Sequence, residues 1–290
     1  MTQAINIPAD FAQFYSAAPS QSQTFVKASS DESIRELHER TWHLFEKGVR
    51  DVKVIRAEKL TAVMTSFGKD SSCVLDIALQ AHKELIAEGV LDSQSPFLVC
   101  NTDTGVESIL VQFLANESIS KLKAHCDAAG INLVFKQGHP PLAKQWSSLF
   151  LSGNKILSTA RVNNDCSVIL KIDSSGETFK QLRGEYGDDI VTLLGSRLDE
   201  SERRKASIKK HGHDNVTAAD LVITADKRQV FLPIVEYVRE NVWYHLNHAG
   251  SNPIKASFDG SSFPSYVDNH RLLAIVYDQS EDKDHCPESD

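Results

Sequence analysis

The chain has 290 residues, of which 41% are apolar and 24% are charged, as is ordinary for a globular protein. Its net charge of −8 argues against a protein whose whole surface binds nucleic acid. It contains no apolar run of about eighteen residues, and its N-terminal segment has no basic region followed by an apolar core. We therefore predict neither a membrane span nor a secretory signal, and we expect a cytoplasmic protein.

Residues 1–30 are rich in Ala, Ser, Gln and Pro, and we expect an irregular arm there. The chain then alternates between amphipathic stretches and short apolar runs. The amphipathic stretches predict helices at 31–49, 71–88, 106–130, 138–152 and 200–212. The apolar runs predict strands at 60–65, 96–102, 131–137 and 189–196. The segment 230–250 is expected to begin extended and to become helical around Val235.

Short apolar strands separated by helices indicate βαβ units and a parallel sheet. We therefore expect a doubly wound α/β fold with an α-helical leader. The predicted organisation is an N-terminal arm and helix over 1–50, a sheet domain over 51–250 and a C-terminal tail over 251–290. The sequence has no internal repeat.

Five cysteines are scattered along the chain, and no two of them form a Cys-x-x-Cys pair. Neither a disulfide framework nor a zinc site closed within the chain is therefore predicted. We expect Cys73, Cys100 and Cys126 to be reduced, buried thiols.

The stretch SFGKDSS at 66–72 lies between the first predicted strand and the helix after it. Ligands bind beyond the carboxyl ends of parallel strands, and the start of a helix attracts anions. Gly68 permits close backbone approach or a positive φ, and Lys69 supplies a cation. The plainer alternative is that Gly68 turns the chain and Ser71 caps the helix. The spacings of the Walker A loop and of the dinucleotide fingerprint are absent.

SFGKDSS resembles the pyrophosphate loop of the ATP pyrophosphatases, the adenine-nucleotide α-hydrolases. In that family the loop grips the β- and γ-phosphates of ATP and leaves the α-phosphate open to attack. The resemblance implies catalytic roles for Lys69 and Asp70. It implies that ATP is bound by Ser66, Phe67, Gly68, Lys69, Ser71 and Ser72.

NTDTGVES at 101–108 follows the second predicted strand and resembles the Asp-Thr-Gly segment of the phosphoadenylylsulfate reductase branch. The resemblance implies that Asp103 and Thr104 lie near the nucleotide. Asp70 and Asp103 are then candidate Mg²⁺ ligands, because that ion prefers hard oxygen ligands. The alternative is an Asp-Thr-Gly turn that caps a helix.

LLGSRLDESERRK at 193–205 follows the fourth predicted strand and resembles a further element of the same family. The residues that match are Gly195, Arg197, Glu200, Ser201 and Arg204. The resemblance implies that Gly195 and Glu200 help to bind the nucleotide. Arg197 and Arg204 are expected phosphate ligands, because guanidinium groups offer fixed, bidentate donors, and Arg197 is also a catalytic candidate. The alternative is a charged surface helix.

NNDCSVILKID at 163–173 resembles the family segment in which an Asp or Cys precedes a lysine by about five residues. The resemblance implies a catalytic role for Lys171. Cys166 is a candidate sulfur carrier, and a buried thiol is the alternative reading. FLPIVEYVRENVWYHL at 231–246 resembles a further family segment, which is mostly structural.

The tail LLAIVYDQSEDKDHCPESD at 272–290, together with SFGKDSS and LLGSRLDESERR, resembles the DNA-phosphorothioation ATP pyrophosphatases (DndC and SspD type). This resemblance implies that ATP and Mg²⁺ are used to adenylate a DNA backbone phosphate, with release of pyrophosphate. Sulfur that originates from a cysteine desulfurase then replaces a non-bridging oxygen. Other phosphorothioation subunits are expected partners. Because Cys166 and Cys286 alone cannot complete a four-cysteine iron–sulfur cluster, we expect no intact cluster in this chain.

The acidic net charge indicates that a partner supplies much of the DNA contact, with the basic run 202–213 as a local phosphate-binding segment. Two alternative functions stay open. One is a phosphoadenylylsulfate reductase of sulfate assimilation, although its Glu-Cys-Gly-Leu-His tail motif is missing. The other is a non-catalytic ATP-binding subunit of a larger assembly.

Overall fold

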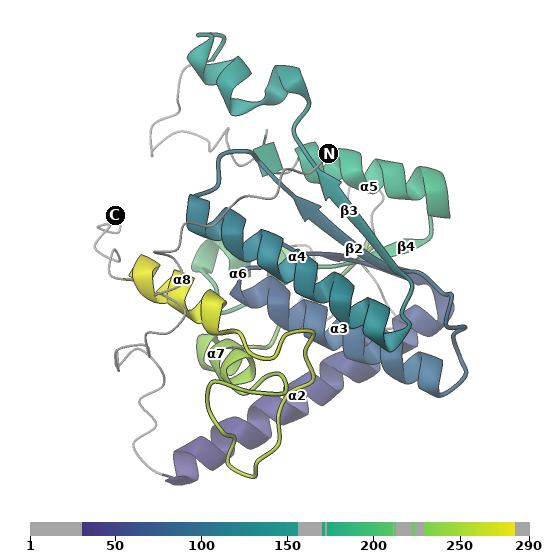
Figure 1. Ribbon diagram of the computed structural model, residues 1–290, viewed down its shortest axis with the longest axis vertical. Coiled ribbons are helices and arrows are strands. Elements are labelled where there is room, and N and C mark those ends of the chain that lie inside the picture. The colour runs from purple at the N-terminus through teal and green to yellow at the C-terminus, as the bar shows by residue number, and fades with distance from the viewer. Residues whose placement is uncertain are drawn as a thin grey trace.

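The computed structural model describes residues 31–155, 170–171, 173–210, 212, 222–223 and 229–281. Its centre is a six-stranded sheet in the order β3-β2-β1-β4-β6-β5 (Figure 1). The strands are β1 (Leu60–Met64), β2 (Phe97–Thr102), β3 (Leu133–Gly138), β4 (Ile190–Leu193), β5 (Val222–Ile223) and β6 (Gln229–Phe231). All neighbouring strands are parallel except β5 and β6, which pair antiparallel at one edge.

Helices connect and flank these strands. The α-helices are α2 (Asp31–Glu58), α3 (Lys69–Ala87), α4 (Ile109–Ala129), α5 (Asp173–Tyr186), α6 (Glu202–Lys210), α7 (Arg239–Asn247) and α8 (Arg271–Glu281). In place of the helix expected over 138–152, the structure has a 3₁₀ turn, Leu142–Lys144, and a π-helical turn, Ser147–Leu151. α7 begins at Arg239 instead of near Val235, because residues 233–236 form a turn that starts at Pro233.

Alternating side chains of the strands are buried on opposite faces of the sheet. Val63, Val99 and Leu193 belong to a core that includes residues of α2, α3, α4 and α7. Ala62 and Leu98 face the other way and pack against α5. On that second face, near β6, α6 contributes a smaller apolar cluster. Helices on both faces of a mostly parallel sheet confirm the predicted doubly wound α/β fold.

The leader helix α2 is longer than the helix predicted over 31–49 and continues to Glu58. Phe45, Val49 and Val52 are buried at helical spacing, and they belong to the same core as α3 and α7. The leader helix and the sheet therefore share one core.

The last described segment brings α8 beside α4 (Figure 1). α8 is anchored at its N-terminal end, where His270 Nε2 lies 3.4 Å from Oδ2 of Asp76, a buried residue of α3. Ser265 donates a hydrogen bond to the other Asp76 oxygen over 2.8 Å, and Leu273 of α8 is buried in the main core. These contacts hold α8 near the start of α3. Among the described helices, none has both the length and the apolar character that a membrane crossing needs.

Candidate functional site

The loop 66–68 connects β1 to α3 at the carboxyl end of the sheet, where the sequence predicted an anion site. Phe67 has a φ of +56°, whereas Gly68 has a φ of −78°, so the left-handed residue is the phenylalanine. The Phe67 side chain is buried, and its N–H donates to Thr65 Oγ1 over 2.9 Å. Burial of the ring compensates for a backbone conformation that costs roughly 1–2 kcal/mol. Of the two roles considered for Gly68, only close approach applies.

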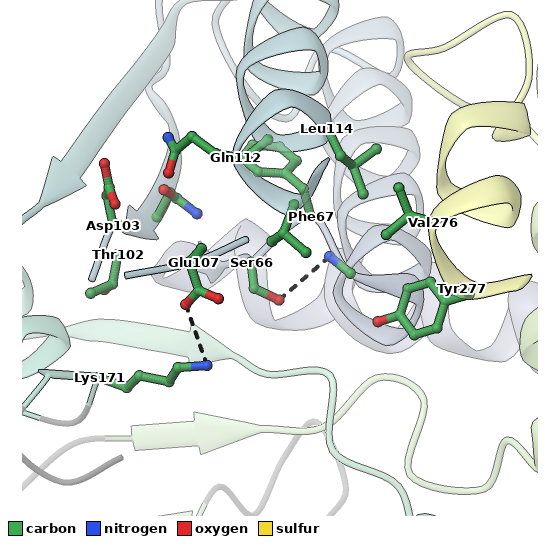
Figure 2. A pocket seen from close by; sticks show the side chains of 14 residues that line it. Ser66, Phe67, Thr102, Asp103, Glu107, Gln112, Leu114, Lys171, Val276 and Tyr277 are labelled. Atoms are coloured by element: carbon green, nitrogen blue, oxygen red, sulfur yellow. Dashed lines mark hydrogen bonds and ion pairs between the residues drawn. The ribbon is translucent and has the colours of Figure 1, made fainter. Parts of the chain in front are cut away.

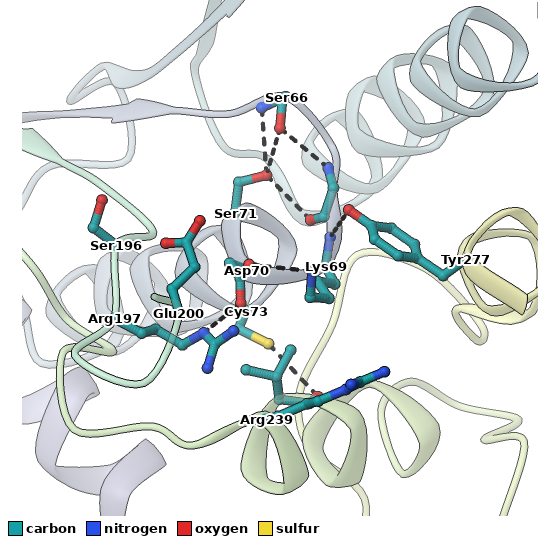
Figure 3. A network of polar contacts seen from close by, with 12 residues as sticks. Ser66, Lys69, Asp70, Ser71, Cys73, Ser196, Arg197, Glu200, Arg239 and Tyr277 are labelled. Carbon is teal, nitrogen blue, oxygen red and sulfur yellow. Dashed lines mark hydrogen bonds and ion pairs between the residues drawn. The ribbon is translucent and has the colours of Figure 1, made fainter. Parts of the chain in front are cut away.

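Backbone N–H groups in the loop and at the start of α3 donate long hydrogen bonds to side-chain hydroxyl oxygens. Gly68 is the N-cap of α3, with no side-chain cap. The Ser66 N–H donates to Ser71 Oγ over 3.3 Å, and the Gly68 N–H donates to Ser66 Oγ over 3.4 Å. The Lys69 N–H donates to Tyr277 Oη, also over 3.4 Å (Figure 3). Hydrogen bonds of this length are weak, so anionic oxygens can replace the hydroxyls at the positive end of the helix.

Gly195, which follows β4, packs closely against the backbone at the start of α3. A Cβ at this position would lie 3.0 Å from the carbonyl carbon of Asp70 and from the nitrogen of Ser71. Both are backbone atoms in the first turn of the helix. The close approach explains the glycine and fixes the loop against the β4 end of the sheet.

Arg197 lies beneath the loop and is paired with Asp70. Its Nε donates to Asp70 Oδ1 over 2.6 Å, and its side chain is only 3% exposed (Figure 3). The Lys69 ammonium lies 3.7 Å from the other Asp70 oxygen. Arg197 was expected to bind phosphate, but it lines neither of the two pockets described next. In this geometry it positions Asp70.

A polar pocket of about 480 Å³ opens over the loop, between the carboxyl ends of β1 and β4. The predicted site residues that line it are Ser66, Gly68, Lys69, Asp70, Ser71, Lys171, Gly195, Glu200 and Arg204. Arg204 Nη1 donates to Ser196 Oγ over 3.1 Å, while Nη2 lies 3.4 Å from Glu200 Oε1. The pocket therefore brings together basic side chains that lie far apart in the sequence.

A second, more apolar pocket of about 290 Å³ adjoins the polar pocket (Figure 2). Val111, Leu114 and Ala115 of α4 and Val276 of α8 form its apolar wall. Its polar side includes Asn101, Thr102, Asp103 and Gln112. Six residues line both pockets: Ser66, Gly68, Thr102, Glu107, Lys171 and Tyr277. The two pockets therefore form one continuous site.

An ion pair marks the border between the pockets. Lys171 Nζ lies 3.5 Å from Glu107 Oε1, and the Lys171 side chain is 62% exposed (Figure 2). Thr104 is buried and donates from Oγ1 to the same Glu107 oxygen over 3.1 Å. Thr104 thus orients Glu107 and lines neither pocket. Sequence reasoning missed Glu107, although it lies within the quoted Asp-Thr-Gly segment.

The two candidate Mg²⁺ ligands differ in their surroundings. Both oxygens of Asp70 face cations, so its carboxylate is a poor fit for a divalent metal. Asp103 lines the apolar pocket, where its Oδ1 accepts the Gly105 N–H over 2.9 Å and its Oδ2 lies 3.8 Å from His139 Nδ1. Within the described residues, no group of three or more His, Cys, Asp or Glu side chains is arranged to hold a metal ion.

Two further predicted residues are not found at the pockets, each for a different reason. Ser72 faces the core with 1% exposure, and it hydrogen-bonds Tyr266 instead of lining a pocket. Cys166 lies outside the described residues, as does Cys286. The roles suggested for Cys166 therefore stay predictions.

The cysteine prediction is confirmed where the structure describes these residues. Cys73, Cys100 and Cys126 are free and buried. Burial raises the pKa of the Cys100 and Cys126 thiols to about 12, and it raises that of Cys73 well above its usual range. Because the thiolate is the reactive form, these groups are chemically inert at neutral pH.

Sequence reasoning also missed the apolar wall from α4 and the contribution of Tyr277. The residues of α4 gave no signal, because their spacing fits any amphipathic helix. Tyr277 lay in the quoted C-terminal tail, but nothing in the sequence placed α8 against the loop.

The sequence matches no protein-family model and no curated protein sequence. Among solved structures, FMN adenylyltransferase from Candida glabrata, in complex with FAD and inorganic pyrophosphate, is 10% identical with a TM-score of 0.40. That similarity covers 76% of this chain and 67% of that chain. The U34-tRNA thiolase NcsA from Methanococcus maripaludis, with its 4Fe–4S cluster, is 15% identical with a TM-score of 0.41. That similarity covers 89% of this chain and 75% of the thiolase chain. Similarities this distant do not bear on the activity of the present chain.

Proposed function

We propose that this chain is an ATP pyrophosphatase, which cleaves ATP to AMP and pyrophosphate while adenylating an acceptor. The observation that carries the proposal is the continuous site over the loop 66–68. There an anion-binding helix start, the Lys69 ammonium and the Arg204 guanidinium adjoin an apolar pocket at the same edge of the sheet. The resemblance of SFGKDSS to the pyrophosphate loop supports the same assignment.

The polar pocket suits the β- and γ-phosphates. Phosphate oxygens can accept hydrogen bonds from the N–H groups of Gly68 and Lys69, which now donate to hydroxyls. Lys69 and Arg204 supply positive charge at the pocket wall. Charge that develops on the leaving pyrophosphate is stabilised by these preorganised donors, and this is the main catalytic contribution that we assign to the chain.

The apolar pocket suits the nucleoside. Aliphatic side chains of α4 and α8 offer a surface for a base, while Gln112 offers an amide group that can fix its orientation. With the base there and the pyrophosphate over the loop, the α-phosphate falls at the border of the pockets, near Lys171 and Glu107. Mg²⁺ would be held chiefly by phosphate oxygens, with Asp103 as the available protein carboxylate. It would neutralise phosphate charge.

For the acceptor we propose a DNA backbone phosphate, as in DNA phosphorothioation. A non-bridging oxygen attacks the α-phosphorus, and the bond to the bridging oxygen of pyrophosphate breaks. A nucleophilic sulfur then bonds to the DNA phosphorus, and the bond to the adenylated oxygen breaks, so that this oxygen leaves as part of AMP. A cysteine desulfurase is the proposed origin of the sulfur, together with other phosphorothioation subunits. α6 supports a nucleic-acid acceptor, because it carries the exposed Arg203, Lys209 and Lys210 as well as the pocket residue Arg204.

Product analysis of ATP turnover tests the proposal. ATP is incubated with Mg²⁺ and the protein, with and without DNA and partner subunits, and the nucleotides are separated. We expect AMP and pyrophosphate, and Lys69→Ala should abolish both. Lys121→Ala on the exposed face of α4 serves as the control. ADP and phosphate as products would refute the proposal. ATP binding without AMP under every condition would favour the non-catalytic subunit. In a separate assay with phosphoadenylylsulfate and reduced thioredoxin, release of sulfite would favour the reductase.

A further inference from the structure

Tyr277 of α8 makes two contacts with Lys69, the first residue of α3. Its hydroxyl accepts the Lys69 N–H over 3.4 Å, and its ring faces the Lys69 ammonium, with Nζ 4.6 Å from the ring centroid. The Trp243 indole packs edge-on against the same ring, with centroids 5.5 Å apart. Figure 3 shows the phenol oxygen pointing at the start of α3.

The loop sequence is matched to this contact. A Cβ at Gly68 would lie 3.0 Å from the Tyr277 hydroxyl oxygen. Glycine at this position therefore lets the phenol reach the backbone of the loop. Tyr277 also lines both pockets, so a ligand that spans them passes beside its ring.

We propose that Tyr277 is a positioning residue of the nucleotide site and that it acts on Lys69 in two ways. The hydroxyl occupies the position at the Lys69 N–H that a phosphate oxygen takes in the complex. The ring holds the Lys69 ammonium at the edge of the polar pocket. This inference rests on the proposed ATP binding, and it adds a residue from the C-terminal helix to that site.

The two contacts differ in strength, so phosphate binding should break the hydrogen bond and preserve the contact between the ring and the ammonium. A neutral hydrogen bond of 3.4 Å is weak, whereas a backbone N–H bound to a phosphate oxygen forms a shorter, charge-assisted bond. A phosphate therefore displaces the hydroxyl. The ring can keep its contact, because an ammonium has three donors and only one side of it faces the ring.

The surroundings of Tyr277 limit how far it moves. His270 at the start of α8 contacts buried Asp76, and Leu273 is 2% exposed in the main core. The helix is therefore anchored on the N-terminal side of Tyr277. We expect the phenol to shift only far enough to release the Lys69 N–H, with the ring still against the ammonium and α8 still docked. Trp243 lies against the moving ring and so provides a fluorescence reporter.

Two variants separate the two contacts. Tyr277→Phe removes the hydroxyl and keeps the ring, while Tyr277→Leu removes both. Ile275→Ala is the matched control, because it lies on the same helix and lines neither pocket. Thermal unfolding of each variant shows whether it is folded.

Binding is measured by calorimetry with α,β-methylene ATP and Mg²⁺, and turnover is measured as pyrophosphate release. For Tyr277→Phe we expect Kd to fall by about threefold with little change in kcat, since a weak competing hydrogen bond is lost. For Tyr277→Leu we expect kcat to fall by about tenfold relative to Tyr277→Phe, because the ammonium loses its aromatic support. If Tyr277 only stabilised the fold, Tyr277→Phe would not lower Kd, and Tyr277→Leu would not lower kcat relative to Tyr277→Phe. Nucleotide should also change the tryptophan fluorescence of the native protein, and Trp243→Phe should abolish that change.

The outcomes separate this inference from the proposed function. If the native protein binds the analogue but Tyr277→Phe binds it no more tightly, or if Tyr277→Leu keeps the kcat of Tyr277→Phe, the role of Tyr277 is refuted and ATP binding stands. If the native protein binds neither ATP nor its analogue, both proposals are refuted.

Discussion

Arg197 Nε and Asp70 Oδ1 lie 2.6 Å apart, and this contact joins the end of β4 to the first turn of α3. The arginine is 3% exposed and lies beneath the nucleotide site, whereas Asp70 also lines the polar pocket. Asp70 in turn lies beside the Lys69 ammonium. Arg197 therefore fixes the orientation of Asp70, and with it the start of α3, from beneath the polar pocket.

Breaking this pair should destabilise the protein. Asp70→Asn leaves the buried Arg197 guanidinium with only the more distant Asp199 carboxylate, 3.7 Å from Nη1, and Arg197→Met leaves the Asp70 carboxylate with only the nearby lysine. We expect each single variant to lower the free energy of unfolding by about 3 kcal/mol, measured by urea denaturation.

The double variant Asp70→Asn with Arg197→Met provides the control for that prediction. Because it removes both charges, it should be more stable than the sum of the single effects predicts, by about 1–2 kcal/mol. Strict additivity would show that the two groups do not interact energetically.

Gly195→Ala tests the close approach between β4 and α3. The new Cβ would lie 3.0 Å from backbone atoms of Asp70 and Ser71, so the helix start must shift. We expect a loss of about 1–2 kcal/mol in the free energy of unfolding and weaker ATP binding by calorimetry. Gly184→Ala in α5 is the control, since nothing lies within 4 Å of its new Cβ, and it should stabilise the protein slightly. Equal effects of the two substitutions would contradict the role assigned to Gly195.

His82 should make the protein acid-sensitive. Burial, together with the nearby charge of Arg56, lowers the pKa of His82 from 6.5 to about 4. The unfolded chain therefore binds more protons between these two pH values. The stability that His82 contributes is complete above its unfolded pKa and is lost as the pH falls toward its folded pKa.

The measurement is the free energy of unfolding at about pH 7 and about pH 5. His82 alone should account for a loss of about 2 kcal/mol over this interval, and His82→Leu should remove that part of the slope. His245 and His248 also have lowered pKa values because they are buried, so some slope should remain. An unchanged slope in His82→Leu would show that His82 is not the group that titrates.

The parallel sheet and the loop at its edge were predictable because each depends on local sequence. The apolar runs of strand length predicted β1, and the glycine and lysine before an amphipathic stretch predicted the start of α3 and the loop before it. α5 was not predicted, because Gly176 and Gly184 interrupt its helical pattern. β5 was missed because it is only two residues long.

The side-chain partners at the site were less predictable because they depend on tertiary contacts. A sequence cannot show that Arg197 turns inward to Asp70, since the same motif would also fit an arginine that faces a phosphate. Nor can it show that Tyr277, 208 residues further along the chain, contacts the Lys69 backbone.

The exposed lysines at the end of α6 give the test of the DNA acceptor. Lys209 and Lys210 are exposed at the end of a helix whose Arg204 lines the polar pocket. If they contact DNA phosphates, Lys209→Glu with Lys210→Glu should weaken DNA binding and reduce the slope of log K against log salt by about 2, with ATP binding unchanged. Lys121→Glu with Lys123→Glu on α4 makes the same change in net charge away from the pocket, so it controls for overall repulsion. If both double variants weaken DNA binding equally, the effect comes from net charge, and α6 is not the DNA-contacting helix.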